Sequence, residues 1–195
     1  LTPSNIPFIV MDLIEGTNLQ EQILNYGPLS VKRFCDIFVQ ASDALAHAHK
    51  RGVIHRDIKP ANMILAASDD GKDFIRIVDF GIAKVIASDA LTTQELTQTG
   101  DLVGSPLYMS PEQGLGKAVD ARSDIYSLGC MMYECLSGQP PFSAETALET
   151  LLQHTTEAPM PLKNGGDLAP VVRRCLEKDP EDRYANAEEL GQALL

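Results

Sequence analysis

The sequence lacks an excess of basic residues, long apolar runs and any internal repeat. Its 27 acidic residues outnumber its 16 lysines and arginines, which gives a formal net charge of −11. This balance argues against nonspecific binding to nucleic acid or to an anionic membrane, since such binding depends on a basic face. No apolar run approaches the ~20 residues of a membrane span, and no signal peptide is recognisable. No low-complexity tract or charged tail is present either.

Cysteine is scarce, and its spacing does not suggest paired thiols. The four cysteines form no CxxC pair and stand near no histidine cluster: Cys35, Cys130, Cys135 and Cys175. We therefore expect a reduced setting in which they act as small core residues.

The composition that remains is that of an ordinary globular protein. Hydrophobic residues make up 44% and charged residues 22% of the chain, both usual values for a soluble domain. A length of 195 residues suffices for one domain with a substantial core, or for a large piece of one. Because the chain begins with Leu1 rather than methionine, we expect a fragment of a longer protein.

Hydrophobic periodicity predicts a mostly helical chain with short strands near its start. We expect a buried strand over 6–11, a short helix over 18–25 that stops at Gly27-Pro28, and a long helix over 31–50. Five apolar residues of the long helix fall on one face: Phe34, Phe38, Ala41, Leu45 and Ala48. His47 and His49 lie near its end, where imidazoles suit the helix dipole.

The second half of the chain is predicted to be helical around one buried element. Two short strands, over 63–66 and 74–78, are expected on either side of the polar turn SDDGKD. From residue 123 the sequence SDIYSLGCMMYECLSG is apolar on nearly all sides, which indicates a buried helix that ends at Gly138. Further helices are expected over 144–154, 168–178 and 186–194.

One stretch places charged residues between two apolar runs. Residues 53–65 read VIHRDIKPANMIL, in which His55, Arg56 and Lys59 surround Asp57, and Asn62 follows. Farther along come Asp79-Phe80-Gly81 and Ser110-Pro111-Glu112. A surface loop could carry such charges without a role, but a loop held between buried elements usually cannot, so we expect these residues to be functional.

The motifs together resemble the C-terminal lobe of eukaryotic-like (Hanks-type) serine/threonine protein kinases. A lone H-x-D or D-F-G is a weak signal, but HRDIKPAN, VDFG, GSPLYMSPE and SDIYSLG follow one another in the family's order. LYMSPEQ and DARSDIYSLGC look most like bacterial members. The resemblance covers essentially the whole chain, and it implies an α+β, protein-kinase-like fold with a mainly helical C-lobe and short β-strands.

The resemblance implies a role for each residue of the charged stretch. Transfer of a phosphoryl group needs metal ions, a carboxylate near the acceptor hydroxyl and a cation on the migrating group. Asp57 matches the catalytic base, and Lys59 matches the lysine that meets the transferring phosphate and is typical of serine/threonine specificity. Asn62 and Asp79 match the ligands of Mg²⁺, a cation that prefers oxygen. The packing residues that align the site would be His55, Phe80 and Gly81.

Other matches are structural or line the nucleotide site. Asp124 would anchor the backbone of the catalytic loop, and Glu112 and Arg183 would form a buried ion pair. On the nucleotide side, Met11 falls at the gatekeeper position, and the carbonyl of Asp12 and the amide of Ile14 would hold the adenine edge. Ile64 and Val78 either line the adenine pocket or are plain core residues.

The threonine-rich run LTTQELTQTGDLVGS lies in the segment that matches the activation segment. An arginine such as Arg56 beside the catalytic aspartate marks family members that are switched on when a phosphothreonine pairs with a basic pocket. Thr97 and Thr99 are the expected sites of this autophosphorylation. Ser105 stands where threonine is usual and keeps the hydroxyl expected to contact Asp57 and Lys59.

We thus interpret residues 1–195 as one fragment of a protein kinase domain. Its parts are the hinge strand and hinge over 6–18, the catalytic loop over 53–65, the activation segment over 79–112 and the helical C-lobe over 113–195. The sequence contains no G-x-G-x-x-G loop, no V-A-I-K-type lysine and no partner glutamate helix. With the N-lobe largely absent from this chain, we expect the segment alone to bind ATP poorly and not to turn over.

The implied function is transfer of the γ-phosphate of ATP to serine or threonine hydroxyls of protein substrates. ATP and Mg²⁺, with Mn²⁺ as a substitute, are the implied cofactors; self-association for trans-autophosphorylation is an expected interaction, and no nucleic acid is expected. We expect a cytoplasmic kinase domain, in a parent protein that could be membrane-anchored elsewhere. Two alternatives stay open: a non-catalytic pseudokinase scaffold, and a small-molecule phosphotransferase of aminoglycoside-kinase type, which would lack the GSPLYMSPE segment and the Glu112–Arg183 pair.

Overall fold

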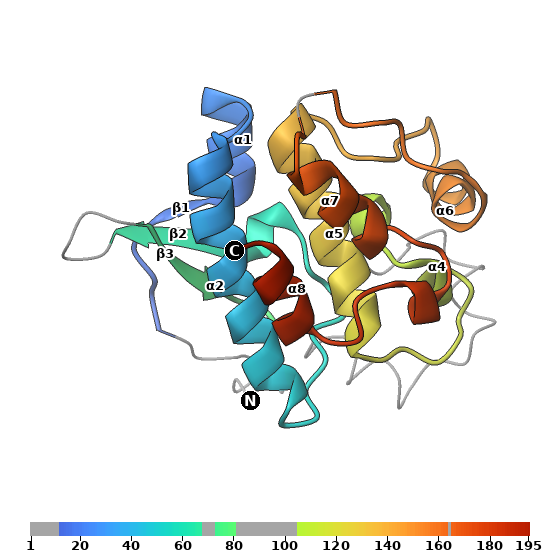
Figure 1. The fold of residues 1–195 in the computed structure, drawn as a ribbon, viewed down its shortest axis with the longest axis horizontal. Helices are drawn as coiled ribbons and strands as arrows, with labels where there is room; N and C mark the ends of the chain where they lie inside the picture. Colours follow the sequence, from blue (N-terminus) through green and yellow to red (C-terminus); the bar gives the residue numbers. More distant parts are fainter. Residues whose placement is uncertain (1–11, 68–72, 81–104, 164) are drawn as a thin grey trace, which may run out of the picture.

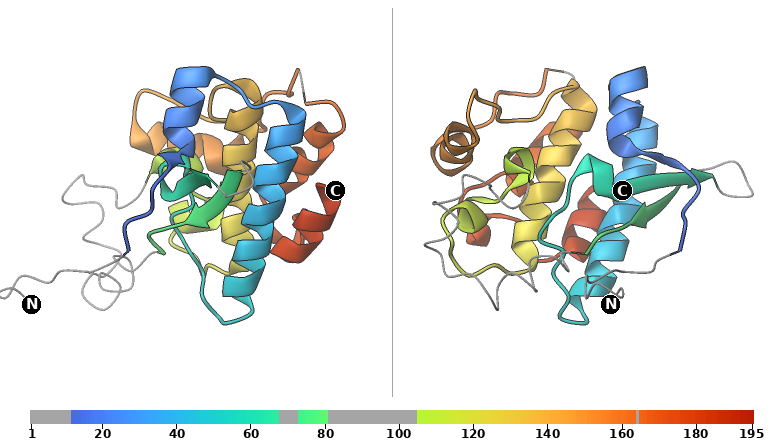
Figure 2. Two further views of the ribbon diagram at one scale, coloured as in Figure 1. Left: turned by 90° about the vertical axis from the view of Figure 1, so that its left-hand side faces the viewer. Right: turned by 180° about the vertical axis from the view of Figure 1, so that it is seen from behind.

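Two long helices form the centre of the fold. The computed structural model describes residues 12–67, 73–80, 105–163 and 165–195. Helices α2 (Val31–His49) and α5 (Ala121–Ser137) lie side by side, with the small sheet beside α2 and helix α6 (Ala147–Thr156) on the far side of α5 (Figure 1). The rotated views show α8 (Ala187–Ala193) on the outer side of α2 and α6 set apart from the sheet (Figure 2).

Helix α2 confirms the long helix predicted over 31–50. It starts because Ser30 accepts a hydrogen bond from the Arg33 amide at the N-terminal cap. The apolar face predicted from spacing is buried from Phe34 to Leu45, whereas Ala48 is only half-buried near the helix end. The chain then turns at Gly52, whose φ of 73° is in the left-handed region that favours glycine.

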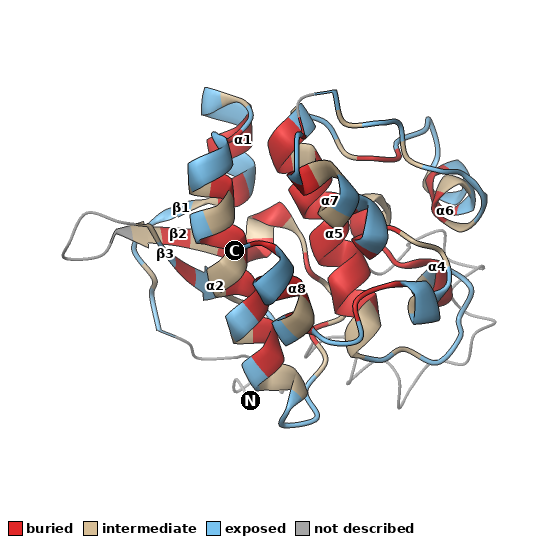
Figure 3. Ribbon diagram, in the orientation of Figure 1, coloured by how far each residue is buried: buried red, intermediate tan, exposed pale blue. Residues whose placement is uncertain are grey.

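Helix α5 is buried on nearly every side, as its sequence predicts. Met131 and Met132 are fully buried core residues, and Figure 3 shows most of the helix in the buried colour. Gly129 lets α7 (Leu168–Cys175) approach closely, since a Cβ added there would lie 2.6 Å from the Cβ of Cys175. The helix ends at Gly138, which adopts a φ of 84°.

The strands form one small antiparallel sheet in the order β1–β2–β3. β2 (Met63–Ala67) and β3 (Asp73–Ile77) match the two predicted strands to within a residue or two at each end. β1 (Thr17–Asn18) was not predicted, because two residues carry no periodicity that could reveal them. Gly16, just before β1, lies close to β2, since an added Cβ there would be 2.5 Å from the carbonyl oxygen of Leu65.

The shorter helices complete the lobe. α1 (Leu19–Tyr26) confirms the helix predicted over 18–25 and ends at Gly27, as expected. α6, α7 and α8 confirm the last three predicted helices, although α6 begins at Ala147 rather than 144 and α7 ends at Cys175 rather than 178. Beyond its end, the carbonyls of Glu177 and Lys178 accept hydrogen bonds from Arg183. The remaining short elements are α4 (Pro111–Gly114) and the 3-10 turns η1 (Pro60–Asn62), η2 (Pro106–Tyr108) and η3 (Pro180–Asp182).

Two features that the sequence addressed can be compared with the structure: the state of the cysteines and the length of the apolar helices. All four cysteines are free; Cys130, Cys135 and Cys175 are buried, and Cys35 is half-buried. None of the described helices is both long enough and apolar enough to cross a bilayer. The strand predicted over 6–11 lies outside the described residues.

Candidate active site

The loop between α2 and β2 is fastened to α5 by one carboxylate. Asp124 accepts hydrogen bonds from the backbone amides of His55 and Arg56, each at 2.8 Å. Asp124 itself is only 1% exposed. Arg56 has a φ of 65°, a conformation that costs a non-glycine residue about 1–3 kcal/mol and persists only where its surroundings enforce it. The anchor on Asp124 is such an enforcement.

His49 contributes to this anchor, which the sequence interpretation missed. Its Nε2 lies 2.8 Å from Oδ2 of Asp124, the same oxygen that accepts from the His55 amide. The sequence suggested only a favourable placement of His49 near a helix end. The contact joins residues that are far apart in the chain, so no local pattern could have indicated it.

Asp57 lies at the centre of the loop between a cation and an amide. The Nζ of Lys59 donates to Oδ2 of Asp57 at 2.7 Å. The side-chain amide of Asn62 donates to the Asp57 carbonyl at 2.9 Å and to its Oδ2 at 3.3 Å. The side chains of Asp57 and Lys59 remain 23% and 28% exposed, so the carboxylate is held in place and can still be reached from solvent.

His55 joins the loop to the segment that follows β3. It is fully buried, and its Nδ1 accepts a hydrogen bond from the Asp57 amide at 3.2 Å. Its Nε2 therefore carries the proton and donates to the Val78 carbonyl at 2.9 Å. The ring also packs on Phe80, with 4.6 Å between the ring centroids. Both nitrogens are occupied, which suits an aligning residue better than a proton carrier.

Asp79 is brought next to Asn62 by the backbone. The amide of Val78 donates to the carbonyl of Asn62 at 3.0 Å. Asp79 is exposed and has a φ of 58°, the second non-glycine residue in the left-handed region among those described. A strained backbone at two positions of one site is common where catalytic groups must be aimed.

Glu112 and Arg183 form a buried ion pair with two parallel hydrogen bonds. The guanidinium donates to Oε1 and Oε2 of Glu112 at 2.8 and 2.9 Å. Burial raises the pKa of Glu112, but the hydrogen bonds from Arg183 and Ser123 outweigh this effect and hold the pKa below its ordinary value. The pair ties α4 to the loop after α7.

Gln113 is a second positioning residue that the sequence interpretation missed. Its side-chain amide donates to the Arg56 carbonyl at 2.9 Å, and its Oε1 accepts from the Ser110 amide. Ser110 and Gln113 thus make a capping box that starts α4 and also fixes the catalytic loop. The spacing S-P-E-Q signals the capping box, but not the bond to Arg56.

Ser105 lies in a small hollow beside Asp57, which Tyr108 also lines. Within the described part of the chain, its hydroxyl makes no hydrogen bond to Asp57 or Lys59, so the expected contact is not made in this structure. The Tyr108 hydroxyl donates to Glu134 of α5 at 2.6 Å, which anchors η2 beneath the hollow.

The predicted nucleotide-site residues that the structure describes are not deeply buried. Asp12 is exposed, and Ile14, Ile64 and Val78 are half-buried rather than deep in the core. The remaining ones lie outside the described residues: Met11, Gly81, Thr97 and Thr99.

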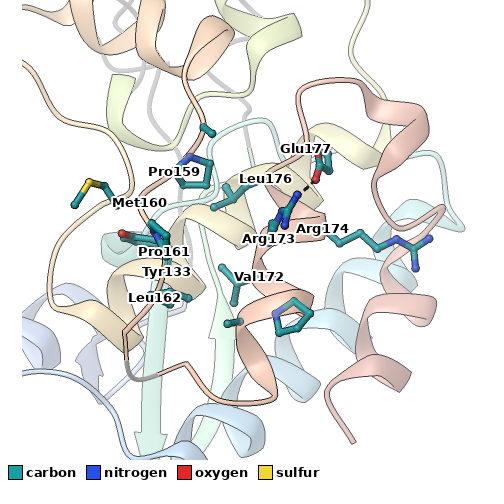
Figure 4. A pocket seen from close by; sticks show the side chains of 13 residues that line it. Tyr133, Pro159, Met160, Pro161, Leu162, Val172, Arg173, Arg174, Leu176 and Glu177 are labelled. Carbon is teal, nitrogen blue, oxygen red and sulfur yellow. Dashed lines mark ion pairs between the residues drawn. The ribbon is translucent and has the colours of Figure 1, made fainter.

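A larger hollow, of about 610 Å³, lies away from the catalytic loop. It is bounded by Tyr133 of α5, the segment 158–162 and α7 (Figure 4). Its charged groups are Arg173, Arg174 and Glu177, and two of these, Arg173 and Glu177, pair with each other across 3.8 Å. Its one carboxylate, Glu177, is paired with Arg173, and no second carboxylate or side-chain amide stands among its lining residues, so we place the candidate active site at Asp57.

Comparison with known proteins gives a consistent result over the whole chain. The protein kinase domain family matches residues 2–194. The chain is 40% identical over 200 residues to "Serine/threonine-protein kinase PknB" of Mycobacterium tuberculosis, and it covers 31% of that protein. It is 37% identical to "Probable serine/threonine-protein kinase PknB" of Corynebacterium glutamicum, of which it covers 30%. The chain thus spans about a third of the length of these relatives.

Solved structures agree on the fold. The kinase domain of Mycobacterium tuberculosis PknI superposes with a TM-score of 0.68 at 27% identity, over 94% of this chain and 62% of that one. Rad53 superposes with a TM-score of 0.75 at 22% identity, over 95% of this chain and 46% of that one. The fold is therefore a protein-kinase fold, represented mainly by its helical lobe. The chain belongs to the protein kinase family.

Proposed function

We propose that this chain carries the catalytic loop of a serine/threonine protein kinase, which transfers the γ-phosphate of ATP to serine or threonine hydroxyls of protein substrates. The observation that carries the proposal is the Asp57 carboxylate, held by Lys59 at 2.7 Å and by Asn62 on a loop anchored to Asp124. A carboxylate that is fixed yet accessible can orient a hydroxyl and accept its proton.

Lys59 and Asp57 divide the work of the transfer in this proposal. Asp57 acts as the base toward the acceptor hydroxyl. Lys59 meets the migrating phosphoryl group, whose negative charge is spread over several oxygens and needs a cation nearby. Their mutual hydrogen bond keeps both groups in place before substrate arrives.

The residues present fit a magnesium ion bound together with ATP. The Nδ2 of Asn62 is used in hydrogen bonds to Asp57, which leaves Oδ1 as a free acceptor within the described residues. Asp79 supplies an exposed carboxylate from the neighbouring segment. Mg²⁺ usually takes one or two protein carboxylates and completes its shell with phosphate oxygens and water. Mn²⁺ accepts the same oxygen ligands, and the bound ion would neutralise charge on the phosphates.

The adenine of ATP is assigned to the segment before β1. We place the carbonyl of Asp12 and the amide of Ile14 on its edge, with Met11 as gatekeeper, and Ile64 and Val78 against its face. The half-burial of Ile64 and Val78 supports this, since residues of the closed core would be fully covered.

Regulation is assigned to the activation segment, over 79–112. Arg56 is next to the proposed base Asp57. A phosphate on Thr97 or Thr99 would carry the negative charge that Arg56 and the groups around it would bind. Such phosphorylation in trans requires that two kinase domains meet, so we include self-association among the partners. Phosphosite mapping of active full-length protein should find phosphate on Thr97 or Thr99; its absence from both would remove this part of the proposal.

The division of the chain given above, with the hinge at 6–18 and the catalytic loop at 53–65, is part of the same proposal. So is a cytoplasmic location for the kinase domain, where ATP is available.

The decisive experiment replaces Asp57 with asparagine in the full-length protein. We expect transfer to a protein substrate to fall by about a thousandfold, within the range for loss of a general base, while ATP binding changes by less than about twofold. The exposed Asp36→Asn variant on α2 is the matched control and should keep full activity. Phosphoryl transfer retained by Asp57→Asn would refute the role of Asp57, and a wild-type protein without transfer would favour the scaffold alternative.

A further inference from the structure

His154 is a buried residue of α6 that the proposed chemistry does not use. It is 0% exposed, and its ring packs edge-on against Phe142 with 4.8 Å between the ring centroids. The ring of Tyr126 on α5 lies 5.6 Å away between centroids, and the Tyr126 hydroxyl is 2.9 Å from Nδ1 of His154. The imidazole is therefore held from two sides, which fixes its orientation.

The hydrogen bonds around Tyr126 decide which nitrogen of His154 carries the proton. Burial, with a contribution from Lys178, lowers the pKa of His154 to about 4, so the ring is neutral near pH 7 and has one N–H. Lys178, whose ammonium group can only donate, donates to the Tyr126 oxygen at 3.4 Å. The phenol hydrogen then goes to Nδ1 at 2.9 Å rather than to the His154 carbonyl at 3.5 Å. The proton of the imidazole is therefore on Nε2.

The N–H of His154 faces the turn η2. Nε2 is buried and makes no hydrogen bond to any residue that the structure describes. The backbone of Leu107 and Pro106 in η2 nevertheless acts on the ring, since it favours the protonated form against the effect of burial. Pro106 has no amide N–H, so its backbone can act only through its carbonyl. Because a buried donor without an acceptor is costly, the carbonyls of η2 are the partners that this N–H requires.

The turn η2 forms one wall of the small hollow beside Asp57, to which it contributes Tyr108, next to Ser105. Its own hydrogen bonds are long: the amide of Tyr108 donates to the carbonyl of Ser105 at 3.3 Å. The Met109 amide donates to the carbonyl of Pro106 at 3.4 Å. Both α5 and α6 contact η2, so the turn depends on these helices for its position. A substrate whose hydroxyl reaches Asp57 lies beside the same wall.

We propose that His154 is a positioning residue for the peptide substrate, which holds η2 beside Asp57 because its Nε2–H attracts the carbonyls of Pro106 and Leu107. This role rests on the proposed function, since η2 is the wall against which the acceptor segment of the peptide lies. Without the attraction, η2 occupies its competent position in a smaller fraction of molecules, and the apparent affinity for peptide falls by that fraction. Once peptide is bound, the turn is in place, so the transfer step keeps its rate.

Two amide substitutions separate the roles of the two ring nitrogens. In His154→Gln, the side-chain NH₂ group reaches the position of Nε2 and still donates to η2. In His154→Asn, the side-chain oxygen reaches the position of Nδ1, so the bond from Tyr126 is kept while η2 loses its donor. His47→Asn makes the same chemical change at an exposed histidine of α2 and is the matched control.

Steady-state kinetics of the full-length protein give the first readout, with a synthetic peptide of residues 91–105, LTTQELTQTGDLVGS, as the substrate. We expect the KM for peptide to rise about three- to tenfold in His154→Asn, the range for loss of one hydrogen bond, and less than about twofold in His154→Gln. The KM for ATP and kcat should change less than about twofold in both. A KM for peptide in folded His154→Asn equal to that of His47→Asn would overturn the proposal. So would an equal rise in His154→Gln, because it would assign the effect to packing.

Native-state hydrogen exchange gives a second readout that does not depend on phosphoryl transfer. The amides of Tyr108 and Met109 report on η2, whereas amides in α5 report on global unfolding. We expect exchange in η2, relative to α5, to be at least about threefold faster in His154→Asn than in the wild type and unchanged in His154→Gln. Equal exchange in the wild type and His154→Asn would overturn the role of His154, whereas a wild-type protein without transfer would remove the proposed function. The two failures are therefore distinguishable.

Discussion

Replacing Glu112 with glutamine would leave a fully buried guanidinium without its counter-charge. The Arg183 side chain is 0% exposed and that of Glu112 is 8% exposed, so solvent cannot replace the lost carboxylate. Breaking one partner of a buried pair usually costs about 3–5 kcal/mol.

The structure places the cost at the lower end of this range. Arg183 also donates to the backbone carbonyls of Glu177, Arg122 and Lys178, at 2.8, 3.0 and 3.0 Å. These bonds survive the substitution and keep the guanidinium partly compensated. The glutamine oxygen can still accept one bond, while its NH₂ group would face a donor. We therefore expect the free energy of unfolding to fall by about 3 kcal/mol.

The measurement is urea unfolding of the full-length protein at pH 7, followed by circular dichroism. Glu188→Gln makes the same chemical change at an exposed pair with Lys50, where we expect a loss below about 0.5 kcal/mol. The folded pKa of Glu112 lies below its ordinary value, so its ionised form stabilises the fold above that value. This stabilisation is lost as pH falls through the folded pKa. The deficit of Glu112→Gln should thus shrink in acid; a deficit no larger than that of Glu188→Gln at pH 7 would refute the reasoning.

Three further predictions follow from other contacts. His49→Ala should lower kcat about tenfold with little change in KM for ATP, because Asp124 loses a hydrogen bond that fixes the catalytic loop; steady-state kinetics checks this, and an unchanged kcat would contradict it. Gly129→Ala should lower the free energy of unfolding, measured by chemical denaturation, by about 1–3 kcal/mol, because the new methyl group would lie 2.6 Å from the Cβ of Cys175. A gain in stability, as expected for alanine in an isolated helix, would contradict this and show that α7 can shift to make room. The folded pKa of His154 is about 4 and its ordinary value is 6.5, so between these pH values the unfolded chain binds more protons than the folded protein. The free energy of unfolding should therefore fall by up to about 3 kcal/mol as pH drops from 6.5 to 4. His154→Phe should flatten this pH dependence, and an equal slope in both proteins would assign the acid sensitivity to another group.

The helices show where sequence prediction succeeded and where it stopped. The spacing of Phe34, Phe38 and Leu45 identified α2, and the apolar run around Met131 identified α5 as buried, because both signals depend only on near neighbours. The end of α7 was placed three residues too late, and the sequence could not show that the carbonyls of Glu177 and Lys178 are acceptors for the distant Arg183. The two-residue strand β1 exists only because it pairs with β2.

The candidate site divides in the same way. The order of HRDIKPAN, VDFG and SPE in the sequence was enough to select Asp57, Lys59, Asn62 and Asp79 as candidates. It could not show that His49 and Gln113 help to hold this loop. His49 does so through Asp124, and Gln113 through the Arg56 carbonyl, and both bonds join residues far apart in the chain.

The sequence by itself determined which residue types could perform chemistry and which segments become helices, because periodicity, turn residues and motif spacing are local properties. Only the tertiary structure decided how the loop is held. Asp124 accepts two loop amides and the His49 ring, and these bonds keep Arg56 in a backbone conformation that it would not adopt alone. The physical reason is that a strained loop needs contacts from distant elements to offset its cost, and such contacts exist only once α2 and α5 have packed together.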